Sequence, residues 1–249
     1  MRNNIKDTTS LSQFYHLNSA PWVNETPVPN APFQQPSKTY LHAQRIALPQ
    51  TQTGTIDQLA RARTSHRAFA DVPMPLAACA GLLRTAYAAL GPDQFPGQLM
   101  LRRPVPSAGA LYPLELYVLV RNVTGLDAGV YHYDAMADDL AVLSTDPWED
   151  QAARAFLTWE AVAQAPFILC LSAVFERTQT KYGQRGYRYV LFEAGHVAQN
   201  ICLTAQDQGL GSLCMGGFYD DVLNWMIGLD GLAEAVVYTI AIGTPATGG

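Results

Sequence analysis

The clearest pattern in the chain is a set of apolar runs bounded by charged or turn-forming residues. Residues 116–120, 167–174 and 236–242 are almost entirely apolar, which is typical of strands buried on both faces of a sheet. Residues 130–133 and 140–143 form shorter runs around a polar turn at 134–139 and indicate two more strands. The runs therefore predict a sheet with buried strands.

A second pattern, apolar residues three or four positions apart, predicts helices between these strands. The longest such stretch carries small or apolar side chains at Val190, Leu191, Ala194, Val197, Ala198, Ile201 and Ala205. It stops before Gly209 and Gly211, because a glycine adopts the left-handed cap readily. Shorter helices are predicted over residues 56–62, 75–89 and 150–164. Interspersed helices and strands favour an α/β or α+β fold with helices packed on the sheet.

Residues 1–55 differ from the rest of the chain. They are rich in Pro, Asn, Gln and Thr, and a few aromatic residues interrupt them: Phe14, Tyr15, Trp22, Phe33 and Tyr40. This composition predicts an extended arm that its aromatic residues pin to a surface. We find no repeat and no clear linker. We therefore divide the chain into an N-terminal arm, residues 1–55, and one domain, residues 56–249.

Composition narrows the function classes. The 249 residues are 49% hydrophobic and 15% charged, as in a well-packed globular protein. A net charge of −5 argues against nucleic acid or an anionic membrane as the main partner. No apolar run is long enough to cross a membrane, and the polar N-terminus lacks the apolar core of a signal peptide. We expect a cytoplasmic protein.

The four cysteines give no sign of a metal site. Cys79, Cys170, Cys202 and Cys214 are scattered, with no C-x-x-C pair and no metal-ligand spacing. Buried, reduced thiols are the expected state in a cytoplasmic protein. The sequence therefore predicts no bound metal.

A basic segment after the first predicted helix could bind a phosphate. Arg63 and Arg67 flank Thr64 and Ser65, and guanidinium and hydroxyl groups are suitable donors to a phosphate dianion. A solvated basic loop would have the same composition, so the residues alone leave both interpretations open.

Three other segments suggest an active site. Lys181 and Tyr182 are adjacent in a basic, aromatic stretch and could form an acid/base pair, although a solvated lysine beside a packed tyrosine is the simpler interpretation. Residues 107–110 form a loop of small side chains. Gly216 and Gly217 offer backbone without side chains, which allows close approach of a flat ligand.

Four of these segments together resemble the SagB-type dehydrogenase branch of the nitroreductase superfamily. They read R-T-S-H-R-A-F, P-S-A-G-A-L-Y-P, K-Y-G-Q-R-G-Y-R-Y and G-L-G-S-x-x-M-G-G-F, in that order along the chain. The arm's F-Y-H-L-N-S and R-I-A-L-P are also similar to that branch. The resemblance implies an α+β nitroreductase-like fold with a central, mostly antiparallel sheet, and FMN bound at the interface of a homodimer.

The family's motifs imply roles for eight residues toward FMN. Three would hold the phosphate and ribityl chain: Arg63, Ser65 and Arg67. Five would lie along the flavin ring or face it: Ser107, Ala108, Gly109, Gly216 and Gly217. Many relatives also have a basic residue after the final strand, but this chain continues from Gly243 to Gly249 with none. Another arginine would have to replace it, or Arg63 and Arg67 would act alone.

Relatives in this branch oxidise thiazoline or oxazoline rings in peptides to thiazoles or oxazoles, and the Lys-Tyr pair is implicated in proton removal. Here that pair is Lys181 and Tyr182. The oxidation removes a hydride equivalent and a proton, so it needs a base. A free tyrosine titrates near pH ~10. An ammonium about 4 Å away would favour the phenolate by roughly 4 kcal/mol at most, at an effective dielectric constant of ~20.

The resemblance thus implies an FMN-dependent dehydrogenase that acts on a peptide or carrier-bound intermediate in natural-product biosynthesis. Its partners would include a cyclodehydratase or an assembly-line protein. Three alternatives stay open: desaturation of another amino-acid-derived intermediate, NAD(P)H-dependent nitro or quinone reduction, and a non-catalytic scaffold subunit that keeps its flavin for stability.

Overall fold

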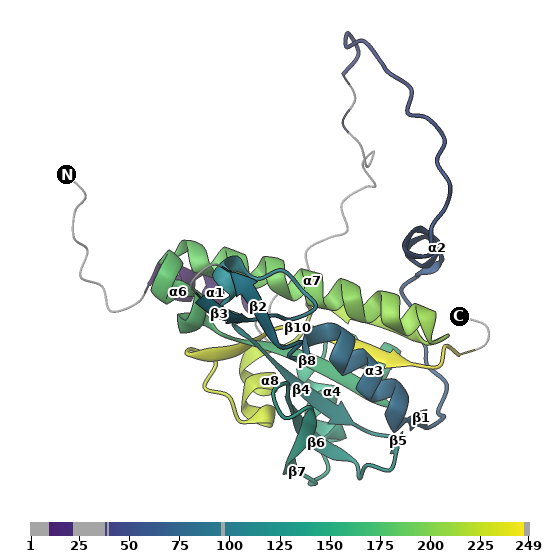
Figure 1. Cartoon of the computed structure of the whole chain (residues 1–249). Helices are drawn as coiled ribbons and strands as arrows, with labels where there is room; N and C mark the ends of the chain where they lie inside the picture. Colours follow the sequence, from purple (N-terminus) through teal and green to yellow (C-terminus); the bar gives the residue numbers. More distant parts are fainter. Residues whose placement is uncertain (1–9, 22–37, 39, 96–97, 247–249) are drawn as a thin grey trace, which may run out of the picture.

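The computed structural model describes residues 10–21, 38, 40–95 and 98–246. Its centre is a six-stranded sheet in the order β7-β6-β4-β8-β10-β9, and each neighbouring pair is antiparallel (Figure 1). The strands are β4 (Leu114–Val120), β6 (Gly129–Asp134), β7 (Asp139–Ser144), β8 (Phe167–Val174), β9 (Gly211–Met215) and β10 (Glu234–Gly243). The predicted α+β fold with a mostly antiparallel sheet is confirmed.

The two central strands are buried on both faces, as their apolar runs predict. Nearly every residue of β4 and β8 is buried. The sheet therefore separates two apolar clusters. One includes Leu82, Val118 and Ile201, and the other includes Ile168 and Leu223.

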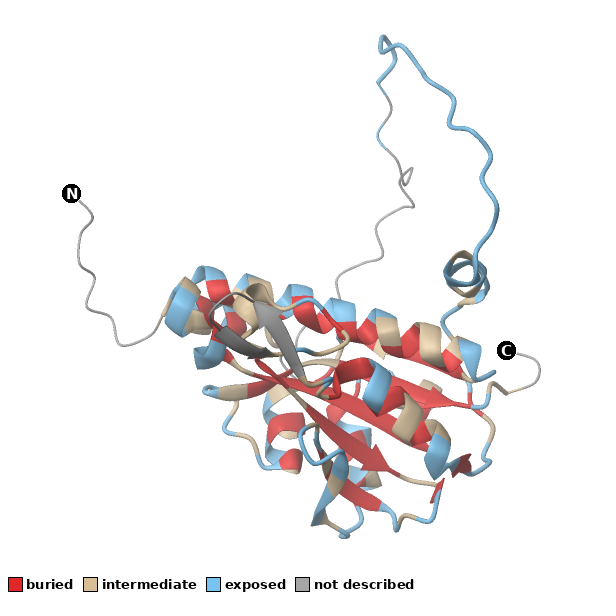
Figure 2. Ribbon diagram, in the orientation of Figure 1, coloured by how far each residue is buried: buried red, intermediate tan, exposed pale blue. Residues whose placement is uncertain are grey.

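Helices cover both faces of the sheet, and Figure 2 shows that their buried sides face it. One face carries α3 (Leu76–Tyr87) and α7 (Arg185–Asp207), and the other carries α4 (Glu149–Ala155), α5 (Trp159–Val162) and α8 (Asp220–Ile227). Of these, α7 is the longest, with 23 residues, and begins at Arg185, five residues before the predicted apolar stripe. The short helix α6 (Phe175–Tyr182) connects β8 to α7.

The remaining elements are short. β1 (Met74–Pro75) pairs in parallel with β5 (Val123–Thr124), and β2 (Pro92–Phe95) forms a hairpin with β3 (Gln98–Leu101). A 3-10 turn, η1 (Ala108–Ala110), precedes β4. No described helix is both long and apolar enough to cross a membrane.

The expectation of an extended arm is wrong for residues 11–19, which form helix α1 (Leu11–Ser19). A capping box begins it, because the Ser10 hydroxyl accepts from Gln13 N while Gln13 Oε1 accepts from Ser10 N. Contacts with α6 and α7 hold it in place: Gln179 Nε2 donates to Ser12 Oγ, and His16 contacts Tyr187. Trp22 and Phe33, two of the five predicted anchors, lie outside the described residues.

The single helix predicted over residues 150–164 is also wrong, because the chain breaks it into α4 and α5. Phe156 leaves the helix to form a bridge with Phe218, and Leu157 N donates to Gly217 O at 3.1 Å. The break therefore ties this segment to the glycine pair that the sequence singled out.

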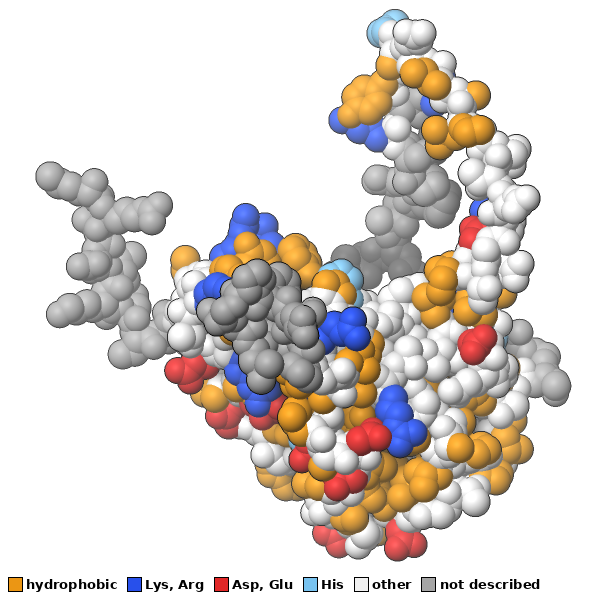
Figure 3. Space-filling model, viewed as in Figure 1, with side chains coloured by type: hydrophobic (Ala, Val, Ile, Leu, Met, Phe, Trp, Pro, Cys, Tyr) orange, Lys and Arg blue, Asp and Glu red, His pale blue; other side chains and the backbone are white. Residues whose placement is uncertain are grey.

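The segment before α2 (Thr55–Ala62) extends away from the sheet (Figure 1). Residues 40–54 are exposed throughout, and α2 contains no buried residue. Figure 3 shows hydrophobic side chains along this segment. They include Tyr40, Leu41, Ile46, Leu48 and Ile56, which are 64% to 87% exposed.

Candidate functional site

The loop between β3 and β4 has an unusual backbone. Gly109, Ala110 and Tyr112 have φ angles of 65°, 52° and 44°, in the left-handed region that residues with a Cβ rarely adopt. Tyr112 N donates to Ser107 Oγ at 2.9 Å, and Arg103 N donates to Tyr112 Oη at 3.2 Å. These bonds hold the small residues of the loop in one strained conformation.

Lys181 and Tyr182 converge on this loop. They occupy the last turn of α6, the short helix that precedes α7. A Cβ placed on Gly109 would lie 2.8 Å from Lys181 Nζ and 2.9 Å from Tyr182 Oη. Lys181 Nζ is also 5.4 Å from the centroid of the Tyr182 ring. The amine and the phenol therefore share one position above the glycine.

Neighbouring rings and a cavity complete this half of the site. The Tyr182 ring packs edge-on against Tyr189, with 5.0 Å between centroids. A cavity of 580 Å³ opens beside the loop and is lined by Arg103, Ser107 and Gly109, among others. The site thus combines an amine, a phenol and a backbone wall around Gly109.

The basic segment after α2 lies beside the other edge of the sheet. Ser65 forms a parallel bridge with Ser212 of β9, and His66 N donates to Ser212 O at 3.0 Å. The segment passes so close to Gly211 that a Cβ there would lie 2.8 Å from His66 Cγ. Among the described residues, neither Arg63 nor Arg67 has an acidic partner within 4.0 Å. The edge of β9 therefore carries two unpaired positive charges.

The predicted glycine wall follows β9 directly. Gly216 is exposed, and a Cβ there would meet nothing within 4 Å. Gly217 is closer to the protein, since a Cβ on it would lie 3.3 Å from Leu157 Cδ1. Gly216 thus leaves open backbone for a ligand, whereas Gly217 contacts the α4–α5 break.

The structure does not bring all predicted site residues together within one chain. The loop at Ser107 lies against Glu193 of α7, while Arg63 lies near Cys202, nine residues further along that helix. At a rise of 1.5 Å per residue these positions are about 14 Å apart. Arg67 lines a separate cavity of 590 Å³ with residues of the α4–α5 region. Within one chain the predicted site residues therefore form two half-sites, one at the Gly109 loop and one at Arg63.

The four cysteines are free, as expected, but two of them are in contact. Cys202 Sγ of α7 and Cys214 Sγ of β9 are 3.4 Å apart. Their contact, Ser212 and the Arg63 charge lower the pKa of Cys202 and oppose the effect of burial. The linear spacing gave no signal of this pair, because the contact forms only when α7 packs against β9. Among the described residues no cluster suits a metal ion.

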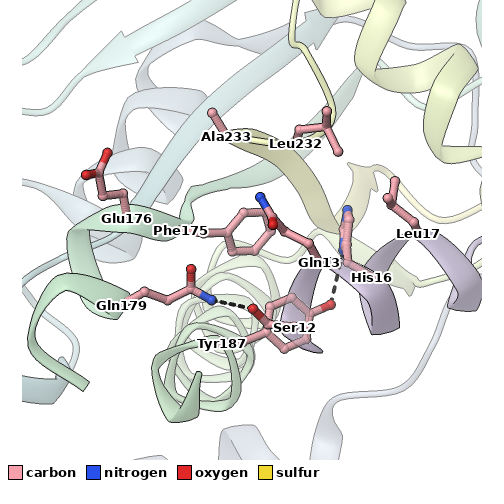
Figure 4. Close-up of a pocket in the computed structure, with 10 residues that line it drawn as sticks. All are labelled: Ser12, Gln13, His16, Leu17, Phe175, Glu176, Gln179, Tyr187, Leu232 and Ala233. Atoms are coloured by element: carbon pink, nitrogen blue, oxygen red, sulfur yellow. Dashed lines mark hydrogen bonds between the residues drawn. The ribbon is translucent and has the colours of Figure 1, made fainter. Parts of the chain in front are cut away.

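Two further polar sites had no clear signal in the sequence. His132 Nε2 lies 2.9 Å from Glu115 Oε2, and this contact raises the pKa of His132. A cavity of 240 Å³ lies between α1 and α6 and is lined by His16, Gln179 and Tyr187, among others (Figure 4). It was missed because the expected arm contained no helix.

The residues present fit an FMN cofactor. The unpaired Arg63 and Arg67 suit a phosphate dianion. Near them, His66 Nδ1 is buried without a hydrogen-bond partner in the part of the chain that the structure describes. The open backbone at Gly216 and the loop at Gly109 provide surfaces without side chains for a flat ring.

Comparison with known proteins agrees with this geometry. The Nitroreductase family profile matches residues 60–244. The chain is 38% identical over 176 residues to MJ1384 of Methanocaldococcus jannaschii, a protein named as a nitroreductase, and the match covers 71% of this chain and 85% of that protein. It is 35% identical over 137 residues to the microcin B17-processing protein McbC of Escherichia coli, covering 52% of this chain and 50% of McbC.

A solved structure extends the likeness in fold. The Escherichia coli microcin synthetase McbBCD complex, with truncated pro-MccB17 bound, contains a chain that matches 96% of this one, with 84% of that chain covered. The TM-score is 0.62 and the sequence identity 24%. Together, the family match and the similarity to MJ1384 show that the chain belongs to the nitroreductase family and is an FMN-dependent oxidoreductase.

Proposed function

We propose that the protein oxidises azoline rings, thiazolines or oxazolines, to azoles on a peptide or carrier-bound intermediate in natural-product biosynthesis. The observation that carries the proposal is the convergence of Lys181 Nζ and Tyr182 Oη on Gly109. A reductase needs no protein base at this position, whereas ring oxidation does. The similarity to McbC, a microcin-processing protein, supports the same reaction class.

In this mechanism Tyr182 Oη takes the proton from the ring carbon of the substrate. Bound FMN would accept the hydride equivalent, so that two electrons and two protons leave the azoline ring. Lys181 Nζ lies beside the same glycine, where its amine can interact with the Tyr182 oxygen during the proton transfer. The ring of Tyr189 packs edge-on against that of Tyr182.

We further propose that the cofactor site is completed by a second copy of the chain. The two half-sites lie about 14 Å apart along α7 within one protomer. A homodimer would place Arg63, Ser65 and Arg67 of one copy opposite the Ser107–Gly109 loop of the other. The exposed apolar side chains of residues 40–56 supply surface for that contact. Analytical ultracentrifugation should therefore find a dimer that sediments together with the flavin absorbance.

The substrate would reach this site on a larger carrier. The chain matches only about half of McbC, so partner proteins are part of the proposal rather than of the family assignment. The McbBCD complex holds a peptide precursor. We expect a comparable peptide and a cyclodehydratase partner that forms the azoline ring before this enzyme acts.

Replacement of Tyr182 tests the proposed function. Tyr182→Phe should keep the fold and the bound flavin but reduce azoline turnover by ~10²–10⁴-fold, the usual effect of losing a positioned acid or base. Lys181→Ala should have a similar effect, and the double variant should be little worse, because the two groups act as a unit. The matched control is Tyr189→Phe, which removes a neighbouring hydroxyl and should turn over normally.

The assay compares single turnover of a thiazoline peptide with anaerobic flavin reduction by NADPH. Wild-type oxidation of the peptide by Tyr182→Phe would refute the proposed mechanism. If instead NADPH reduces the flavin rapidly and the peptide does not, the protein is a nitro or quinone reductase.

A further inference from the structure

Glu193 is an acid buried in the middle of α7, under the candidate site. It is 2% exposed, and burial raises the pKa of its carboxyl group. A buried carboxyl is unfavourable unless hydrogen bonds compensate for the lost water. One such bond comes from Tyr87 Oη, which donates to Glu193 Oε1 at 2.7 Å. Neither the proposed proton transfer nor phosphate binding uses this group.

The contacts of Glu193 lead to both ends of the strained loop. At one end the Ser107 hydroxyl lies against the carboxyl group and lowers its pKa, while Ser107 Oγ accepts from Tyr112 N at 2.9 Å. At the other end Tyr87 Oη, which donates to Glu193, accepts from Leu114 N at 3.1 Å. Glu193 is thus connected to the residues that begin and end the loop.

Arg103 closes this network from the side. Its guanidinium carbon lies 4.2 Å from the centroid of the Tyr87 ring and 5.4 Å from that of Tyr112. It also donates to the Tyr87 carbonyl oxygen. Its charge lowers the pKa of Glu193, which favours an ionised carboxylate against the effect of burial. A charged acceptor makes stronger hydrogen bonds than a neutral one.

We propose that Glu193 is a positioning residue: through Tyr87 and Ser107 it fixes the loop that presents Gly109 to Lys181 and Tyr182. This inference rests on the proposed function of that site. Ala110 and Tyr112 carry side chains at positive φ, a conformation that persists only where the surroundings impose it. In this arrangement Ser107 Oγ already accepts a hydrogen bond from Tyr112 N within the loop.

Hydrogen exchange of the flavin-free protein tests the inference without any turnover. In the Glu193→Ala variant, the amide hydrogens of residues 107–114 should exchange with solvent about 10-fold faster than in the wild type, or more, as expected when a hydrogen bond to a charged group is lost. Glu193→Gln keeps an acceptor for Tyr87 and should restore most of the protection. Tyr87→Phe, a milder change, should expose the Leu114 amide in the same way.

The matched control is Asp138→Ala, which removes the carboxylate partner of another tyrosine, Tyr133, at 2.8 Å. It should loosen the β6–β7 turn and leave residues 107–114 protected. In a second measurement, Glu193→Ala should weaken the binding of FMN and of riboflavin equally, by about 10-fold, because the loop faces the ring and not the phosphate.

A folded Glu193→Ala or Tyr87→Phe protein with unchanged exchange in residues 107–114 would overturn the inference. That outcome is distinct from failure of the proposed function, which would show as normal azoline turnover in Tyr182→Phe. Faster exchange in the loop together with normal turnover in Tyr182→Phe would keep the positioning role and remove only the reaction assigned to the site.

Discussion

Substitution of Gly109 by alanine isolates the geometry on which the proposed chemistry depends. The new Cβ would lie 2.8 Å from Lys181 Nζ and 2.9 Å from Tyr182 Oη, where ordinary contacts are 3.4 Å or longer. Both groups are ends of flexible side chains, so each should move by roughly 0.5–0.6 Å rather than unfold the protein. Since a 1 Å misplacement can cost about 10²-fold in rate, we expect a loss of roughly 10-fold in azoline turnover.

The positive φ at position 109 adds a separate loss of stability, which a control variant measures on its own. An alanine at φ 65° should destabilise the fold by about 1–2 kcal/mol. Gly228→Ala carries the same cost, because Gly228 has φ 82° and ψ 25° and nothing within 4 Å of a Cβ. Urea denaturation should show similar losses of stability in both variants, while single-turnover oxidation should fall only in Gly109→Ala. Equal turnover in the two variants would refute the placement of the catalytic pair over Gly109.

Two further outcomes follow from the charges of the molecule. Replacing Arg63 or Arg67 by alanine should weaken FMN binding by about 1.5–3 kcal/mol, as measured by fluorescence titration. The binding of riboflavin, which has no phosphate, should be unaffected. Equal losses of affinity for FMN and riboflavin would indicate general unfolding instead. Burial raises the pKa of Asp220 from 3.8 to about 6, so the folded state holds this proton more tightly than the unfolded state. The stability that this proton contributes is complete below pH 4 and is lost as the pH rises through 6. Asp220→Asn should therefore show a smaller change in unfolding free energy, measured by urea denaturation, between pH 4 and 6. The same pH dependence in both proteins would contradict this assignment.

The sheet could be predicted from the sequence because its central strands are buried on both faces. The apolar run of residues 167–174 coincides with β8, and that of 116–120 falls inside β4. Helix α1 was missed because its signal is a capping box, Ser10 with Gln13, in a segment otherwise rich in Pro and Asn. The break at Phe156 was missed because its cause is a bridge to Phe218, 62 residues away.

The candidate site shows the same limit. Arg63, Lys181 and Gly216 could be proposed from the sequence because local motifs carry them, and their roles stay predictions. Their grouping depends on packing between distant segments, such as Gly109 under Tyr182, which no local pattern encodes. Glu193 lies on the long predicted helix, three residues after Val190 and four before Val197, and its hydrogen-bond partner Tyr87 is 106 residues away, so no local pattern shows what compensates for its burial.

Helix α2 has a consequence for how the enzyme assembles. A helix of eight residues with none buried has little stability of its own in water. Arg63 follows directly after it, so the order of the phosphate end depends on whatever covers α2. With a second copy as the cover, subunit association and flavin binding become thermodynamically linked and strengthen each other by the same factor. Flavin affinity should then rise with protein concentration, and dilution should release FMN and separate the subunits in a single concerted step.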